Sequence, residues 1–150
     1  MIYIACAVGI FLLDFFVKKK IDKSRELDEE EAICGQKIIL TKYYNKGAML
    51  NFLERWPKAM TAIHTAILAG VAVIYGVVLK TRDNSGIKLG LSMILGGGLS
   101  NLYDRFTKHH VVDYFRLNIG VKKLRNVIFN ISDWFVFLGS VLTVLFGSKK

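Results

Sequence analysis

A run of apolar residues from position 59 to position 79 carries no charged side chain, and this run limits what the chain can fold into. Its length falls within the roughly 17 to 25 residues that a helix needs to cross a bilayer. Further stretches with few charges lie at residues 2–17, 87–103 and 127–147. Together they predict a mainly α-helical membrane protein, a bundle of four transmembrane helices. With 150 residues and one proline, we expect a single domain spanning residues 1–150.

Two polar segments, one after the first predicted span and one after the third, lie on the same side of the membrane, since an even number of spans separates them. Residues 37–52 are rich in β-branched and aromatic side chains, which predicts strands. Residues 111–115 and 117–121 predict two more strands. We expect the acidic cluster at residues 28–31 to lie on the surface, exposed to solvent. We expect a small β-rich cap over the helix bundle.

Two aspartates, Asp113 and Asp133, lie in strongly apolar surroundings near one predicted membrane boundary. A buried carboxylate without a partner is costly, so we expect the two to share one proton. One is then ionised and can activate a water molecule, while the neutral one donates a proton to a scissile carbonyl. The sequence therefore predicts an aspartyl hydrolase that needs no metal and no cofactor.

Other polar residues in the predicted spans fall at helical spacings and share helix faces. The groups are Asp14 with Lys18, Asn101 with Asp104 and Arg105, and Asn130 with Asp133. We expect Asp14 with Lys18, and Asp104 with Arg105, to form internal ion pairs that hold helices together. The three groups lie toward one side of the bilayer, which predicts a single polar pocket where the helices converge.

The remaining composition narrows the classes of partner. The net charge of +9 is spread over loops beside apolar spans without a nucleic-acid-binding motif, so we expect membrane lipids and no nucleic acid as partners. Cys6 and Cys34 lie at different predicted depths and are not expected to pair. A zinc site at His109, His110 and Asp113 is an alternative, but adjacent histidines point in different directions and no third strong ligand is near in sequence.

Five short blocks follow one another along nearly the whole chain. They are Asp14-x-x-x-Lys18, Asn45-x-Gly47-Ala48, Gly97-Gly98-Leu99-Ser100-Asn101-x-x-Asp104-Arg105, Val111-Val112-Asp113-Tyr114 and Phe129-Asn130-x-x-Asp133. Their order and approximate spacing resemble the conserved blocks of bacterial lipoprotein signal peptidase, the signal peptidase II family. The resemblance implies an intramembrane aspartyl endopeptidase that cleaves diacylglyceryl-modified prolipoproteins just before the lipidated cysteine.

The resemblance also implies roles for the conserved positions, with Asp113 and Asp133 as the catalytic pair. Substrate-binding or structural roles fall to Asn45, Gly47, Asn101, Arg105, Asn130, Asp14, Lys18 and Asp104. The implied protein is a multi-pass protein of the bacterial inner or plasma membrane, with its termini cytoplasmic and its cap and active site extracytoplasmic. We expect a monomer.

The distribution of charge alone would predict the opposite orientation. Of the 21 basic residues, 16 lie on the side of the cap, and the positive-inside rule would place that side in the cytoplasm. We follow the resemblance, because the first loop is long and carries seven acidic residues.

Several positions depart from the family pattern and leave alternatives open. They are Met49 and Leu50 after the asparagine block, Ser100 before Asn101, and Ser132 and Trp134 beside Asp133. These changes would act on pocket shape, so an inactive or specialised paralogue that binds or processes one dedicated lipidated peptide is an alternative. A proton-coupled transporter is another, although four spans without an internal repeat leave little room for alternating access. His64, alone in the second predicted span, is expected to be packed or hydrogen-bonded.

Overall fold

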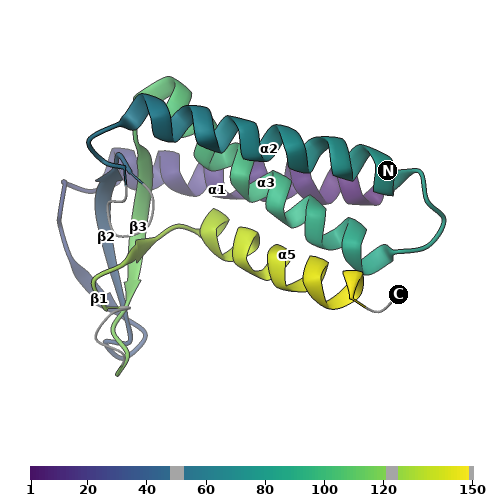
Figure 1. The fold of residues 1–150 in the computed structure, drawn as a ribbon. Coiled ribbons are helices and arrows are strands. Elements are labelled where there is room, and N and C mark those ends of the chain that lie inside the picture. Colours follow the sequence, from purple (N-terminus) through teal and green to yellow (C-terminus); the bar gives the residue numbers. More distant parts are fainter. Residues whose placement is uncertain (48–52, 121–124, 149–150) are drawn as a thin grey trace.

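The computed structural model describes residues 1–47, 53–120 and 125–148. Within these residues the chain is mainly helical, with a small antiparallel sheet. The elements in chain order are α1 (Ile2–Ser24), β1 (Glu31–Ile33), β2 (Ile38–Asn45), α2 (Pro57–Leu79), α3 (Ser85–Lys108), β3 (Val111–Leu117), β4 (Ile128–Phe129) and α5 (Ile131–Gly147). The helices form a bundle, the sheet stands across one end of it, and both chain ends lie at the opposite end (Figure 1).

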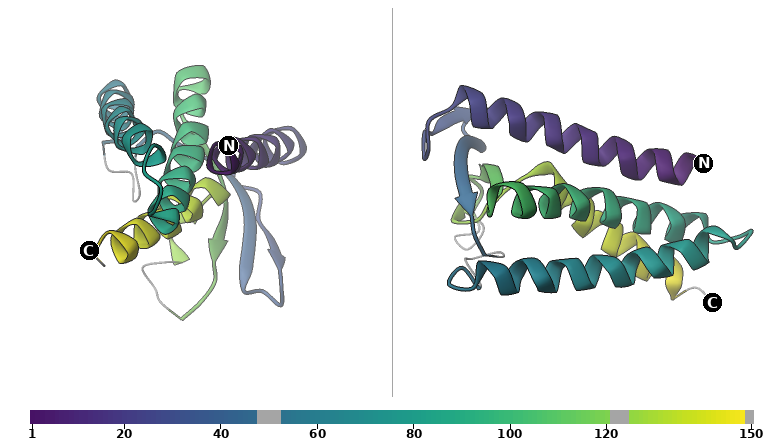
Figure 2. Two further views of the ribbon diagram at one scale, coloured as in Figure 1. Left: turned by 90° about the vertical axis from the view of Figure 1, so that its right-hand side faces the viewer. Right: turned by 90° about the horizontal axis from the view of Figure 1, so that it is seen from above.

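Helix α3 lies among the other three helices and contacts each of them (Figure 2). Its three consecutive glycines explain this close packing. A Cβ atom at Gly96 would lie 2.5 Å from the Ala7 carbonyl oxygen of α1. At Gly97 it would lie 2.6 Å from the Ser132 carbonyl oxygen of α5, and Gly98 faces a leucine of α2. Each glycine therefore lets a different helix approach, and larger residues here would push the bundle apart.

Helix α2 combines an apolar composition with an outward position. Among the described helices, it alone is long and apolar enough to cross a membrane, and only 11% of its most apolar window is buried. The core helix of a water-soluble protein would be mostly buried. Helix α5 is apolar but has 17 residues, and α1 and α3 contain buried charged residues. The count of four membrane spans therefore stays a prediction.

The prediction that helix already begins at residue 127 is wrong. Part of that stretch forms β4, and α5 begins at Ile131 with Asn130 as its N-cap. The Asn130 side chain accepts the N–H of Asp133, and the Asp133 carboxylate accepts the N–H of Asn130. This reciprocal capping box ends the extended segment and starts the helix. Asn130 and Asp133 therefore do not share a helix face, and they meet at a junction between strand and helix.

The sheet has the strand order β1-β2-β3-β4, with every neighbouring pair antiparallel. The strand prediction for residues 37–52 is confirmed by β2 as far as Asn45, while residues 48–52 lie outside the described residues. The acidic segment at residues 28–31 was predicted only as solvated surface. Its glutamates are exposed, but Glu31 begins the edge strand β1.

The prediction of separate strands at residues 111–115 and 117–121 is wrong. Strand β3 continues through Arg116, which pairs with Ile39 of β2 and with Ile128 of β4. Backbone pairing on both sides leaves no place for a turn at this residue. Residue 121 lies outside the described residues.

Candidate active site

Asp113 lies on β3, where the sheet meets the helix bundle, and only 2% of the residue is exposed. Two amide groups bind its carboxylate: Asn45 Nδ2 donates to Oδ2 at 2.9 Å, and Asn130 Nδ2 donates to Oδ1 at 2.7 Å. Burial, together with the charge of Asp133, raises the pKa of Asp113 to about 8, although the two amide bonds act in the opposite direction. Asp113 can therefore hold a proton at neutral pH.

Asp133 lies in the first turn of α5 and is partly exposed. Its Oδ2 atom accepts the backbone N–H of Asn130 at 3.0 Å, and its Oδ1 atom accepts Asn101 Nδ2 at 2.9 Å. The N-terminal end of a helix favours a negative charge, because the free N–H groups there point toward it. Of the two aspartates, Asp133 is thus the better placed to be ionised.

Asn130 connects the two carboxylates and is itself fully buried. Its backbone binds Asp133, while its side-chain nitrogen binds both Asp113 and, at 3.1 Å, Asn101 Oδ1. Both carboxylates line one pocket of about 230 Å³. The pocket is also lined by Asn45, Met60, His64, Ile67, Asn101, Arg105, Val111, Val127, Ile128 and Phe129. The structure therefore brings the two predicted catalytic residues to one cavity, held by a shared asparagine.

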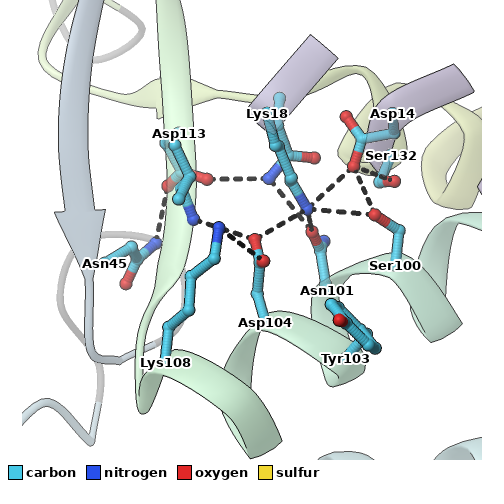
Figure 3. Close-up of polar contacts among 12 residues, drawn as sticks. Asp14, Lys18, Asn45, Ser100, Asn101, Tyr103, Asp104, Lys108, Asp113 and Ser132 are labelled. Carbon is cyan, nitrogen blue, oxygen red and sulfur yellow. Dashed lines mark hydrogen bonds and ion pairs between the residues drawn. The ribbon is translucent and has the colours of Figure 1, made fainter. Parts of the chain in front are cut away.

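Lys18 lies at the centre of a second polar cluster beside this pocket (Figure 3). Its Nζ atom lies 2.7 Å from Asp14 Oδ2 and 3.4 Å from Asp104 Oδ2, and the residue is 1% exposed. The predicted ion pair between Asp14 and Lys18 is confirmed. Lys18 also donates to Asn101 Oδ1 at 2.6 Å. This bond turns the Asn101 amide so that its nitrogen faces Asp133.

The Asp14 carboxylate is fully buried and accepts three further hydrogen bonds. Ser100 Oγ and Ser132 Oγ each donate to Oδ2 at 2.6 Å, and the Tyr114 hydroxyl donates to Oδ1 at 2.9 Å. The sequence assigned no role to Tyr114, and the two serines stood out only as departures from a family pattern. The sequence signal for Tyr114 was its position next to Asp113 on the predicted strand. Because successive residues on a strand point to opposite faces, Tyr114 points away from Asp113 and reaches Asp14.

The predicted ion pair between Asp104 and Arg105 is not formed. Asp104 instead pairs with Lys18 of α1 and, at 3.1 Å, with Lys108 one turn along its own helix. Its carboxylate also accepts the backbone N–H of Val112 at 3.2 Å. Asp104 therefore fixes the start of β3 to the bundle.

Arg105 donates to the backbone carbonyl oxygens of Lys46 and Gly47. Gly47 in turn donates its N–H to Asn45 Oδ1 at 3.0 Å. With the oxygen of the Asn45 amide engaged, its nitrogen is directed at Asp113. Arg105 and Gly47 thus hold the segment that carries Asn45, one of the donors to Asp113.

The alternative zinc site at His109, His110 and Asp113 is not assembled. His110 stacks against Tyr44 with ring centroids 4.0 Å apart. In the parts of the chain that the structure describes, no three His, Cys, Asp or Glu side chains are grouped to hold a metal ion. Cys6 and Cys34 are both free thiols.

Known proteins resemble this chain over nearly its whole length. The family described as "Signal peptidase (SPase) II" matches residues 6–148. The lipoprotein signal peptidase of Pseudomonas fluorescens is 26% identical over 155 residues, covering 99% of this chain and 89% of the relative. That of Halothermothrix orenii is 29% identical over 146 residues, covering 97% and 94%.

Solved structures show the same fold. One bacterial membrane enzyme superposes with a TM-score of 0.80 at 23% identity, covering 95% of this chain and 85% of that one. A second superposes with a TM-score of 0.78 at 21% identity, covering 99% and 93%.

Proposed function

This chain belongs to the signal peptidase II family, and from that premise we propose that it is an aspartic endopeptidase with Asp113 and Asp133 as its catalytic pair. As a lipoprotein signal peptidase, it cleaves the signal peptides of prolipoproteins. One observation carries the aspartic assignment. Two carboxylates line the same pocket, are joined by Asn130, and form no ion pair with a cation among the described residues.

The pair works with one shared proton, which we place on Asp113. Ionised Asp133 takes a proton from a water molecule as the water oxygen attacks the scissile carbonyl carbon, and Asp113 gives its proton to the carbonyl oxygen. Protonated Asp133 then donates to the amide nitrogen as the C–N bond breaks. Asp113 takes back the hydroxyl proton as the carbonyl reforms, so the pair returns to its starting state.

The substrate is a prolipoprotein whose cysteine carries a diacylglyceryl group, cut on the N-terminal side of that cysteine. The pocket fits such a chain because apolar side chains, including Met60, Ile67 and Phe129, surround its polar centre. The apolar walls exclude water from the charged groups, which strengthens their interactions with the reacting peptide bond.

The chain is a membrane protein, and we place all four helices across the bacterial cell membrane. Large apolar side chains are exposed along every helix, as lipid contact requires. The sheet lies at one end of the bundle and both chain ends lie at the other (Figure 1). The pocket is lined by residues of β2 and β3 and by residues at the start of α5, so it lies at the end of the bundle where the sheet is. We assign the sheet and the active site to the extracytoplasmic face, where the precursor's modified cysteine emerges.

The test uses purified protein and a diacylglyceryl-modified precursor peptide, with product masses determined by mass spectrometry. Wild type should release two fragments that separate just before the modified cysteine. Asp113→Asn and Asp133→Asn should each lower the rate by at least about 10³-fold, since each removes one of the two proton-transfer groups.

The matched control is Glu30→Gln, which neutralises an exposed carboxylate paired with Arg116 in the sheet. It should leave the rate unchanged. Cleavage at full rate by Asp133→Asn would rule out the aspartic mechanism.

A further inference from the structure

Helix α2 contains one polar side chain with a buried atom that lacks a hydrogen-bond partner among the described residues. Thr61 and Thr65 each donate to the carbonyl four residues earlier, and the Tyr75 hydroxyl shares a hydrogen bond with Ser92. His64 differs: its Nδ1 atom is buried, and no described residue provides a partner. Of the two expectations for His64, packed or hydrogen-bonded, a hydrogen bond is not formed at this nitrogen, which is packed. A histidine in an apolar helix without such a partner points to a functional contact.

The position of His64 shows where that contact is made. Met60, His64 and Ile67 line the pocket that holds the two aspartates, and their spacing places them on one face of α2. His64 is the one polar member of this face. It stands on α2, whereas Asp113 and Asp133 come from β3 and α5.

Most of the other polar groups that line the pocket are already engaged by the protein. The amides of Asn45 and Asn101 bind the two carboxylates. Two of the Arg105 nitrogens bind backbone carbonyls, which leaves its buried Nε without a partner. His64 and Arg105 are therefore the residues lining this pocket, among those described, that hold a nitrogen without a protein partner.

We propose that His64 is a substrate-contacting residue that hydrogen-bonds a main-chain peptide group of the bound precursor beside the scissile bond. The proposal rests on the proposed peptidase function. An extended peptide brings unpaired N–H and C=O groups into an apolar pocket, and each needs a partner there. Neutral imidazole offers one donor and one acceptor at its two ring nitrogens, so His64, which lines the pocket, can pair with an N–H or a C=O group of the bound peptide.

The experiment compares His64→Phe, which keeps a ring of similar size without nitrogens, with His64→Gln, which restores an amide. With a diacylglyceryl-modified peptide in micelles, His64→Phe should raise KM about fivefold and change kcat less than about twofold. His64→Gln should recover at least half of that loss. Thr65→Val is the matched control on the same helix, since its hydroxyl binds only the helix backbone, and it should leave KM unchanged.

Binding is measured separately in an Asp133→Asn background by fluorescence anisotropy of the labelled, uncleaved peptide. His64→Phe should weaken Kd about fivefold without lowering Tm. Equal KM and Kd for His64→Phe and wild type would overturn the proposal, as would a loss that Thr65→Val reproduces. If wild type binds the peptide but does not cut it, the peptidase function fails and the Kd comparison alone decides the role of His64. Absence of binding by wild type overturns both.

Discussion

Two clusters of buried or half-buried carboxylates lie side by side in this protein, and they are stabilised in different ways. In the first, Asp14 and Asp104 both contact the ammonium group of Lys18. In the second, Asp113 and Asp133 are held by amide N–H groups, and no described cation pairs with either. Under the proposed mechanism, the acids beside a cation form a structural cluster that stabilises the fold, whereas the acids held only by neutral donors exchange a proton.

The physical reason is that an ammonium group cancels the charge of a carboxylate, whereas an amide N–H group does not. An amide stabilises a carboxylate without cancelling its charge, so two such carboxylates still repel each other in a medium of low dielectric. Keeping one proton on the pair relieves that repulsion. Asn101 stands between the clusters: Lys18 binds its oxygen, and its nitrogen binds Asp133. Asn101 thus orients a member of the proposed catalytic pair, while the cation itself pairs with Asp14 and Asp104.

The largest expected effect comes from removing the cation of the structural cluster. Lys18→Met leaves Asp14 buried without its positive partner, and breaking a buried ion pair in this way costs about 3 to 5 kcal/mol. Thermal unfolding in detergent should show Tm lowered by about 10 °C.

Lys108→Met is the matched control, because this lysine also pairs with Asp104 but its side chain is 28% exposed, against 2% for Lys18. It should lower the free energy of unfolding by less than about 1 kcal/mol. Equal losses in Tm for the two variants would contradict the distinction between the clusters.

A smaller effect is expected on the pH dependence of the catalytic pair. The pKa of Asp113 is raised to about 8, so this carboxyl keeps its proton below that pH and loses it as the pH rises further. The rate of peptide cleavage should therefore fall above about pH 8, where both members are ionised.

Asn45→Ala removes a hydrogen bond to Asp113 and should lower kcat about tenfold. Asn45→Ala should also shift the pH profile of cleavage, and the direction of that shift tests the assignment of the pKa to Asp113. The Asn45 hydrogen bond lowers the pKa of Asp113, so its removal should raise that pKa and move the alkaline limb of the rate profile to higher pH. Asn118→Ala is the control, since that exposed amide binds only the Gln36 carbonyl in the cap. A limb that moves to lower pH in Asn45→Ala would refute the assignment.

The smallest effect is expected for a single hydroxyl of the structural cluster. Ser132→Ala removes one of the donors to Asp14, which keeps Lys18 and two others, so the cost should be about 1 kcal/mol. Tm should fall by about 3 °C, and kcat should change less than about twofold, although Ser132 is next to Asp133.

Ser140→Ala on the same helix serves as the comparison, since its hydroxyl is exposed and binds only the Val136 carbonyl. Its Tm should equal that of wild type. A large loss of kcat without a loss of Tm in Ser132→Ala would place that serine in the catalytic cluster instead.

Much of this arrangement could be predicted from short-range patterns. The apolar runs located α1, α2 and α3, and the four-residue spacing of Asp14 and Lys18 predicted their ion pair. The ordered blocks identified Asp113 and Asp133 as candidates. These patterns succeed because helix periodicity and the cost of buried charge act locally along the chain.

Contacts between distant residues could not be predicted in this way. Asp104 was expected to pair with its neighbour Arg105, but the packing of α1 against α3 offers it Lys18 instead. The extended stretch before Ile131 was assigned to a helix, because its apolar character does not distinguish a buried strand from a helix. The strand pairing of Phe129 with Phe115 decides that question.

The sequence by itself determined which residues must be buried, where the helices run, and that acids within apolar surroundings need partners. Only the tertiary structure decided which partner each acid received. Asp14 and Asp113 are both buried carboxylates, yet one meets a lysine and the other meets two amides. The free energy of a buried charge depends on the groups within a few ångströms of it, and those groups come from helices and strands far apart along the chain.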